Sequence, residues 1–148
     1  MVNPFDPRTV LLAKHAQHVV LIHFPIALFI TGVGLDLLSR GKRDSQFASA
    51  AYLNLSISAV TVIPAVLTGL LAWQLVLDGK RLKGLLLWHV IAASIATVLV
   101  ITSWWIHRRT RKSEALLLPG FRIPVELLGV AVIALTAHLG GFLSGVNP

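Results

Sequence analysis

Four long apolar runs alternate with short charged or polar segments along the chain. The runs cover residues 16–38, 47–77, 85–106 and 123–143. Each run reaches the roughly 20 residues that a helix needs to cross the hydrocarbon core of a membrane. The pattern therefore predicts four transmembrane helices.

Composition supports a membrane location. Of the 148 residues, 55% are hydrophobic and only 13% are charged, and the mean hydropathy is +0.79. A soluble domain of this size could not bury so much apolar surface. We therefore expect an all-α integral membrane protein: a single domain over residues 1–148, folded as an antiparallel four-helix bundle with both termini on the same side.

The net charge of +7 does not indicate nucleic acid, because surplus Lys and Arg mark the cytoplasmic loops of membrane proteins. The predicted side of the termini and middle loop holds Arg8, Lys14, Lys80, Arg81 and Lys83. The other side holds more: Arg40, Lys42, Arg43, Arg108, Arg109, Arg111, Lys112 and Arg122. The start of the chain is polar and shows no cleavable signal. We expect a protein in a lipid environment with both termini outside the cytoplasm; in a bacterial inner membrane, the location that the family resemblance given below implies, they would be periplasmic.

The chain contains no cysteine, which excludes disulfides, thiolate-bound zinc and cysteine-held iron–sulfur clusters. It also lacks a nucleophile triad, a phosphate-binding loop and paired carboxylates. Hydrolytic and phosphoryl-transfer activities are therefore not expected, and any enzymatic role is expected to be that of an electron-transfer subunit.

Histidines are the chemically distinctive residues of this chain. His15, His18 and His23 lie near the start of the first predicted span, His89 near the start of the third and His138 near the end of the fourth. In an up-and-down bundle these positions share one leaflet. At 1.5 Å per residue, His23, His89 and His138 lie within roughly 10 Å of the same membrane boundary. Imidazoles within a span indicate function, so we expect these side chains to form a shared ligand site.

Haem b is the cofactor that this pattern favours. A haem needs imidazole on each axial face, an apolar slot, and cations for its propionates. Small residues such as Ala92, Ala96 and Ala134 share helix faces with the histidines and would leave room for a flat macrocycle. The predicted cofactor-binding residues are His15, His18, His23, His89, His138, Lys14, Arg81 and Lys83, serving one or two haems.

Two other interpretations remain open. His18, His23, His89 and His138 could instead bind copper or zinc for transport or sensing, although Met1 is the only methionine. Alternatively, the chain is a non-catalytic membrane subunit whose histidines and small residues serve helix packing.

Two polar residues lie toward the other leaflet. His107 is beside Arg108 and Arg109, so we interpret it as interfacial and not as a ligand. Asp36 is four residues before Arg40, and this spacing predicts an ion pair on one helix. A proton pathway through Asp36 is the alternative.

The motif His15-x-x-His18, followed by His23-Phe24-Pro25-Ile26-Ala27-Leu28, resembles the opening of a bacterial family of predicted four-span membrane proteins, a domain-of-unknown-function family. Further similarities are Asp36, the segment Thr68-Gly69-Leu70-x-x-Trp73, His89 and the ending Leu139-Gly140-Gly141-x-Leu143. Members of that family are sometimes fused to Rieske iron–sulfur domains, which implies a redox setting. Val19 stands where the family commonly has proline.

Together, these observations predict a small membrane b-type cytochrome. It would carry electrons between a quinol and a partner at the outer face, as a subunit of a redox complex. A cytochrome c or a Rieske protein would be such a partner.

Overall fold

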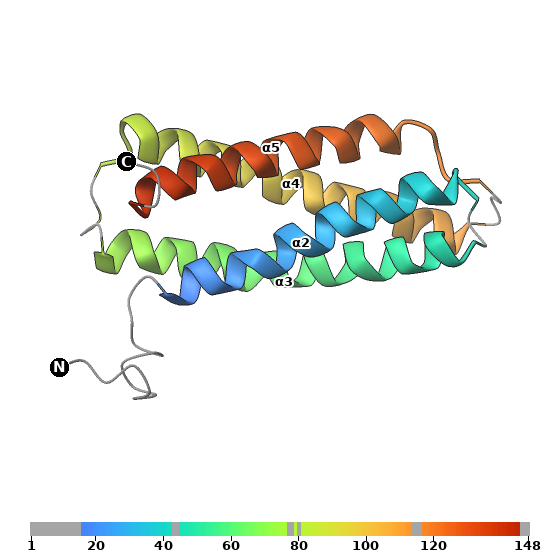
Figure 1. The fold of residues 1–148 in the computed structure, drawn as a ribbon, viewed down its shortest axis with the longest axis horizontal. Helices are drawn as coiled ribbons and strands as arrows, with labels where there is room; N and C mark the ends of the chain where they lie inside the picture. Colours follow the sequence, from blue (N-terminus) through green and yellow to red (C-terminus); the bar gives the residue numbers. More distant parts are fainter. Residues whose placement is uncertain (1–15, 43–44, 77–78, 80, 114–116, 146–148) are drawn as a thin grey trace.

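The computed structural model describes residues 16–42, 45–76, 79, 81–113 and 117–145. Within these residues the chain forms four α-helices (Figure 1): α2 (Ala16–Ser39), α3 (Gln46–Val76), α4 (Gly84–Lys112) and α5 (Arg122–Leu143). The predicted all-α, four-helix architecture is confirmed. The helix bounds match the apolar runs except in α4, which continues past Ile106 to Lys112.

The extension of α4 is stabilised by aromatic side chains beneath its basic residues. The Arg108 and Arg109 guanidinium groups lie 5.0 and 5.2 Å from the ring centres of Trp104 and Trp105. Arg111 lies over the ring of Tyr52 on α3. Such cation–π contacts, and the favourable position of cations at a helix C-terminus, prolong the helix beyond its apolar part.

The surface of the bundle suits lipid. All four helices are long and apolar enough to cross a membrane, over Gln17–Ser39, Gln46–Leu75, Gly84–Lys112 and Arg122–Leu143. Large hydrophobic side chains in the middle turns of the helices, such as Val60, Val98 and Leu135, are more than half exposed. In water this surface would be costly, whereas in a bilayer it faces acyl chains.

The helices pack as two antiparallel hairpins, α2 with α3 and α4 with α5 (Figure 1). The hairpins touch through α3 with α4 and, more sparingly, through α2 with α5. Helices α2 and α4 are therefore diagonal neighbours. Helices α2 and α4 begin at the same end of the bundle, so His18 and His89 both lie at that end. We call it the His18 end, and we call the opposite end the Asp36 end.

The buried core occupies the middle of the bundle and the Asp36 end. Phe29 of α2 is fully buried beside Leu55 and Val100. A Cβ added at Gly129 of α5 would come within 2.8 Å of the Phe29 ring. Glycine therefore lets this ring pack directly on the backbone of the other hairpin.

A tight turn ends α2 at Ser39. Arg40 and Gly41 have φ values of 52° and 75°, and the Gly41 carbonyl accepts a hydrogen bond from the Leu118 N–H at 3.1 Å. The turn after α2 is thus tied to the segment that leads into α5. This contact fixes the start of α5 beside the end of α2.

The two hairpins bury equivalent positions. Buried residues of α2 and α3 recur 71 positions later in α4 and α5. The pairs are Phe29 and Val100, Asp36 and His107, Leu55 and Glu126, Ser58 and Gly129, and Val62 and Ile133. The chain is therefore built as two similar helical hairpins.

Candidate functional site

His18 extends from the first turns of α2 toward α3. Its Nδ1 lies 3.1 Å from the carbonyl oxygen of Ala65 and 3.3 Å from Oγ1 of Thr68. A carbonyl can only accept, so Nδ1 carries the proton and donates it. The Thr68 hydroxyl itself donates to the Pro64 carbonyl at 2.9 Å, which leaves its oxygen to accept.

His89 repeats this arrangement in the second hairpin. Its Nδ1 donates to the Thr136 carbonyl of α5 at 3.1 Å. Both contacts join residues 47 positions apart, and both rings are half-buried. The two histidines are thus held in the same way by the second helix of their own hairpin.

A glycine lies under each imidazole ring. A Cβ added at Gly69 would come within 2.9 Å of Cε1 of His18, and one added at Gly140 within 3.2 Å of Cε1 of His89. Any side chain at these positions would push the ring away from the helix. The two glycines therefore permit the hydrogen bonds that fix the rings.

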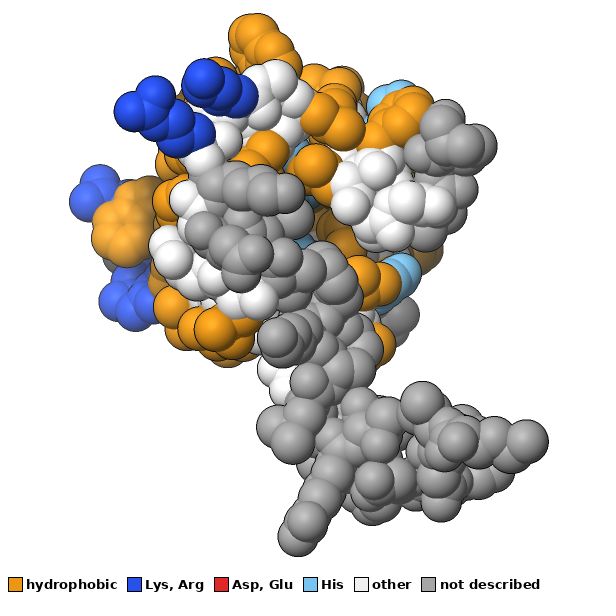
Figure 2. Space-filling view, turned by 90° about the vertical axis from the view of Figure 1, so that its left-hand side faces the viewer, with side chains coloured by type: hydrophobic (Ala, Val, Ile, Leu, Met, Phe, Trp, Pro, Cys, Tyr) orange, Lys and Arg blue, Asp and Glu red, His pale blue; other side chains and the backbone are white. Residues whose placement is uncertain are grey.

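The two rings lie at an end of the bundle whose described side chains are half-buried or exposed. Every described residue classed as buried lies between these histidines and the Asp36 end, and none falls within the described parts of 17–24, 66–91 and 134–145. Figure 2 looks onto this end and shows histidine atoms among hydrophobic side chains. The inward-facing residues here include Leu21, Ala72, Ala93 and Leu139, which are half-buried.

The other described residues that the sequence singled out do not join this pair. His23 is exposed, with Nδ1 2.6 Å from the Val19 carbonyl of its own helix. His138 is exposed and meets the Phe142 ring edge to face, with ring centres 5.0 Å apart. Arg81 and Lys83 are exposed just before α4. His15 and Lys14 lie outside the described residues.

A second polar group occupies the Asp36 end. Asp36 is fully buried, and its Oδ2 accepts a hydrogen bond from Nε of Arg122 at 2.6 Å. The predicted pairing of Asp36 with Arg40 is therefore wrong. Arg40 follows the end of α2 in the left-handed conformation, so it does not continue the helical spacing on which that prediction depended.

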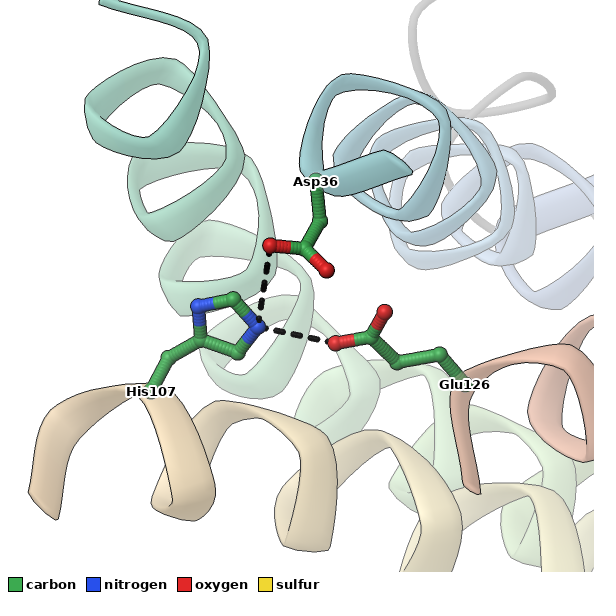
Figure 3. A group of neighbouring side chains, drawn as sticks. All are labelled: Asp36, His107 and Glu126. Atoms are coloured by element: carbon green, nitrogen blue, oxygen red, sulfur yellow. Dashed lines mark hydrogen bonds and ion pairs between the residues drawn. The ribbon is translucent and has the colours of Figure 1, made fainter. Parts of the chain in front are cut away.

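His107 belongs to the same group. Its side chain is 2% exposed, and Nε2 lies within hydrogen-bond distance, 2.8 Å, of Oε1 of the fully buried Glu126. Oδ1 of Asp36 lies 3.9 Å from the same nitrogen, and Figure 3 shows the three side chains converging. The interpretation of His107 as interfacial is therefore wrong, because α4 continues past it and carries it into the bundle.

Comparison with known families agrees with this architecture. A family described as "Predicted membrane protein (DUF2231)" matches residues 14–146, which include all four helices. The chain belongs to this family. No curated protein and no solved structure matches it.

Two features of this DUF2231 chain were not predicted from its sequence. Arg122 and Glu126 lie at the start of α5 and are buried. The sequence pattern placed Arg122 only among the basic residues flanking the spans, and it did not single out Glu126. The internal repeat also went unnoticed. Aligning the chain with itself at a shift of 71 residues would have paired His18-Val19 with His89-Val90 and Gly69 with Gly140.

Proposed function

We propose that this protein is a b-type cytochrome subunit that carries electrons between a membrane quinol and a redox partner at the outer face. One observation carries the proposal. His18 and His89 lie on diagonal helices at one end of the bundle, and each presents Nδ1 to a backbone carbonyl of the adjoining helix.

The hydrogen bonds select the tautomer that axial ligation needs. With the proton on Nδ1, the lone pair of a neutral imidazole is on Nε2, which is the nitrogen that would bind iron. Ligating histidines usually donate their other ring N–H to a carbonyl, which orients the ring and raises its basicity. His18 and His89 both meet this requirement and would be the residues that hold the haem.

The surroundings fit a flat, largely apolar group. Helices pack with axes 8–10 Å apart, so diagonal helices of a square bundle are separated by roughly 11–14 Å. The described residues at this end contain no buried side chain, and Leu21, Ala72, Ala93 and Leu139 line the inward positions. Arg81 and Lys83, exposed before α4, are the cations that we assign to propionates.

A haem bound here would supply an iron centre that exchanges one electron at a time. His18 and His89 would both hold the haem, and a haem held by two histidines would favour electron transfer over oxygen binding. The proposal includes an inner-membrane location with periplasmic termini, which brings the His18 end to the outer face. A quinol in the membrane and a cytochrome c or Rieske partner are the expected neighbours.

The proposal is tested by purifying the chain from haem-replete cells and recording oxidised and reduced absorption spectra with a pyridine haemochrome assay. We expect haem b in the wild type and its loss in His18→Ala and in His89→Ala. His23→Ala and His138→Ala are matched histidine controls and should retain it. A haem-free wild type would contradict the proposal. If elemental analysis instead found copper or zinc whose binding required His18 and His89, a metal-binding function would be favoured.

A further inference from the structure

We propose that Asp36, His107 and Glu126 form a site for a divalent first-row transition-metal ion at the end of the bundle opposite His18. This inference uses none of the residues assigned to haem and does not depend on the cytochrome proposal.

The three side chains come from three different helices, α2, α4 and α5, and converge on one point (Figure 3). One ligand atom of each lies within 4.8 Å of the others. Carboxylate oxygens and an imidazole nitrogen form a mixed set that suits Zn²⁺, Mn²⁺ or Fe²⁺. The geometry therefore provides three protein ligands for a single ion.

The second oxygen of Glu126 indicates that the group needs an occupant. Oε2 is buried and has no hydrogen-bond partner among the residues that the structure describes, and Glu126 is fully buried. In Figure 3 this oxygen points to the side of Asp36. A buried, unsatisfied carboxylate oxygen costs several kcal/mol in a protein interior, and a cation between the carboxylates would remove that cost.

Charge leads to the same conclusion. With a neutral imidazole, the two carboxylates outnumber the single guanidinium of Arg122, so the four groups leave one unmatched negative charge. A proton on His107 would balance that charge but would leave Oε2 without a donor, since Nε2 already lies on Oε1. A metal ion can engage both carboxylates at once.

Arg122 orients the site without blocking it. Its Nε binds Oδ2 of Asp36, which leaves Oδ1 facing His107. Such outer contacts fix the direction of ligating carboxylates. Arg122 also lines a surface pocket together with Leu37, Arg40, Gly41 and Leu118.

The test uses the full chain in detergent, purified without a polyhistidine tag, stripped with a chelator and then incubated with Zn²⁺ or with Mn²⁺ alone. After dialysis, elemental analysis should find about one ion per chain in the wild type. The bound ion should also raise the melting temperature of the wild type. Glu126→Gln and Asp36→Asn, which keep the side-chain volume, should lose both effects.

Matched controls separate this site from the rest of the chain. Asp78→Asn makes the same carboxylate-to-amide change in the segment between α3 and α4, and His138→Gln changes an exposed histidine; both should bind as the wild type does. The double variant His18→Ala, His89→Ala should keep the ion even where it loses haem. The proposal is overturned if the wild type binds neither ion, if Glu126→Gln binds equally, or if the double variant loses the ion.

Discussion

The described histidines of the membrane helices differ in the groups that their ring nitrogens contact. His18 and His89 donate to backbone carbonyls of neighbouring helices, which can only accept. His107 meets two carboxylates, which bind either a proton donor or a cation. The same side chain therefore supports different chemistry at the two ends, and the difference comes from partners that the local sequence does not reveal.

The ion pair of Asp36 with Arg122 gives the first prediction. Asp36→Asn leaves the buried Arg122 guanidinium without a counter-charge, so unfolding should become easier by about 3 kcal/mol. Arg40→Ala, at an exposed residue, should change stability by no more than about 0.5 kcal/mol. Thermal or denaturant unfolding in detergent measures both. Equal losses of stability in the two variants would instead support an ion pair between Asp36 and Arg40, as expected from helical spacing.

Gly69 gives a prediction about the ring of His18. An alanine Cβ 2.9 Å from Cε1 would displace the ring and break its hydrogen bond to Ala65. One hydrogen bond is worth about 1 kcal/mol, so haem affinity should fall about fivefold in Gly69→Ala. Titration of the haem-free chain with haem, followed by absorption, measures this.

Gly34→Ala is the matched control for that change. Gly34 is also within a helix, but nothing lies within 4 Å of its added Cβ. The affinity of Gly34→Ala should equal that of the wild type. A fall in both variants would mean that helix changes in general, and not the position of the His18 ring, affect the site.

At the scale of helices, the apolar runs were sufficient to predict the number, type and approximate bounds of the elements. Hydropathy indicates whether a segment can lie in the hydrocarbon core of a membrane, and each apolar run here is long enough to cross it. The partner of Asp36 could not be predicted, because it lies 86 residues away and depends on how α5 packs beside α2. Spacing within one helix favoured Arg40, but the left-handed turn at Arg40 and Gly41 ends that helix first.

The contact between Phe29 and Gly129 predicts how strongly the hairpins are joined. Phe29→Ala would leave a cavity between α2 and α5. In a lipid-facing bundle little transfer free energy is lost, so the cavity itself dominates and should cost about 2 kcal/mol. Phe24→Ala, on the same helix but 55% exposed, should be nearly neutral. Unfolding in detergent compares the two, and equal losses would contradict this account of hairpin docking.

At the scale of the whole molecule, the repeat places the two proposed sites at opposite ends of the bundle. His18 and Asp36 are separated by 18 positions on α2, and His89 and His107 by 18 positions on α4. At 1.5 Å per residue each separation is about 27 Å, close to the thickness of a hydrocarbon core. Equivalent positions hold two histidines at one end, whereas at the other end they hold Asp36 and His107, so the symmetry of the hairpins is kept for one site and broken for the other.

The direction of the bundle in the membrane is the last prediction, and the absence of native cysteine makes it directly testable. Lys83 and Lys112 are exposed at the two ends of α4. The surplus of basic residues at the Asp36 end predicts that this end is cytoplasmic. In intact cells a membrane-impermeant maleimide should therefore label Lys83→Cys, and Lys112→Cys only after lysis. The reverse pattern would place the histidine pair on the cytoplasmic side, and its redox partner would then have to be a cytoplasmic protein.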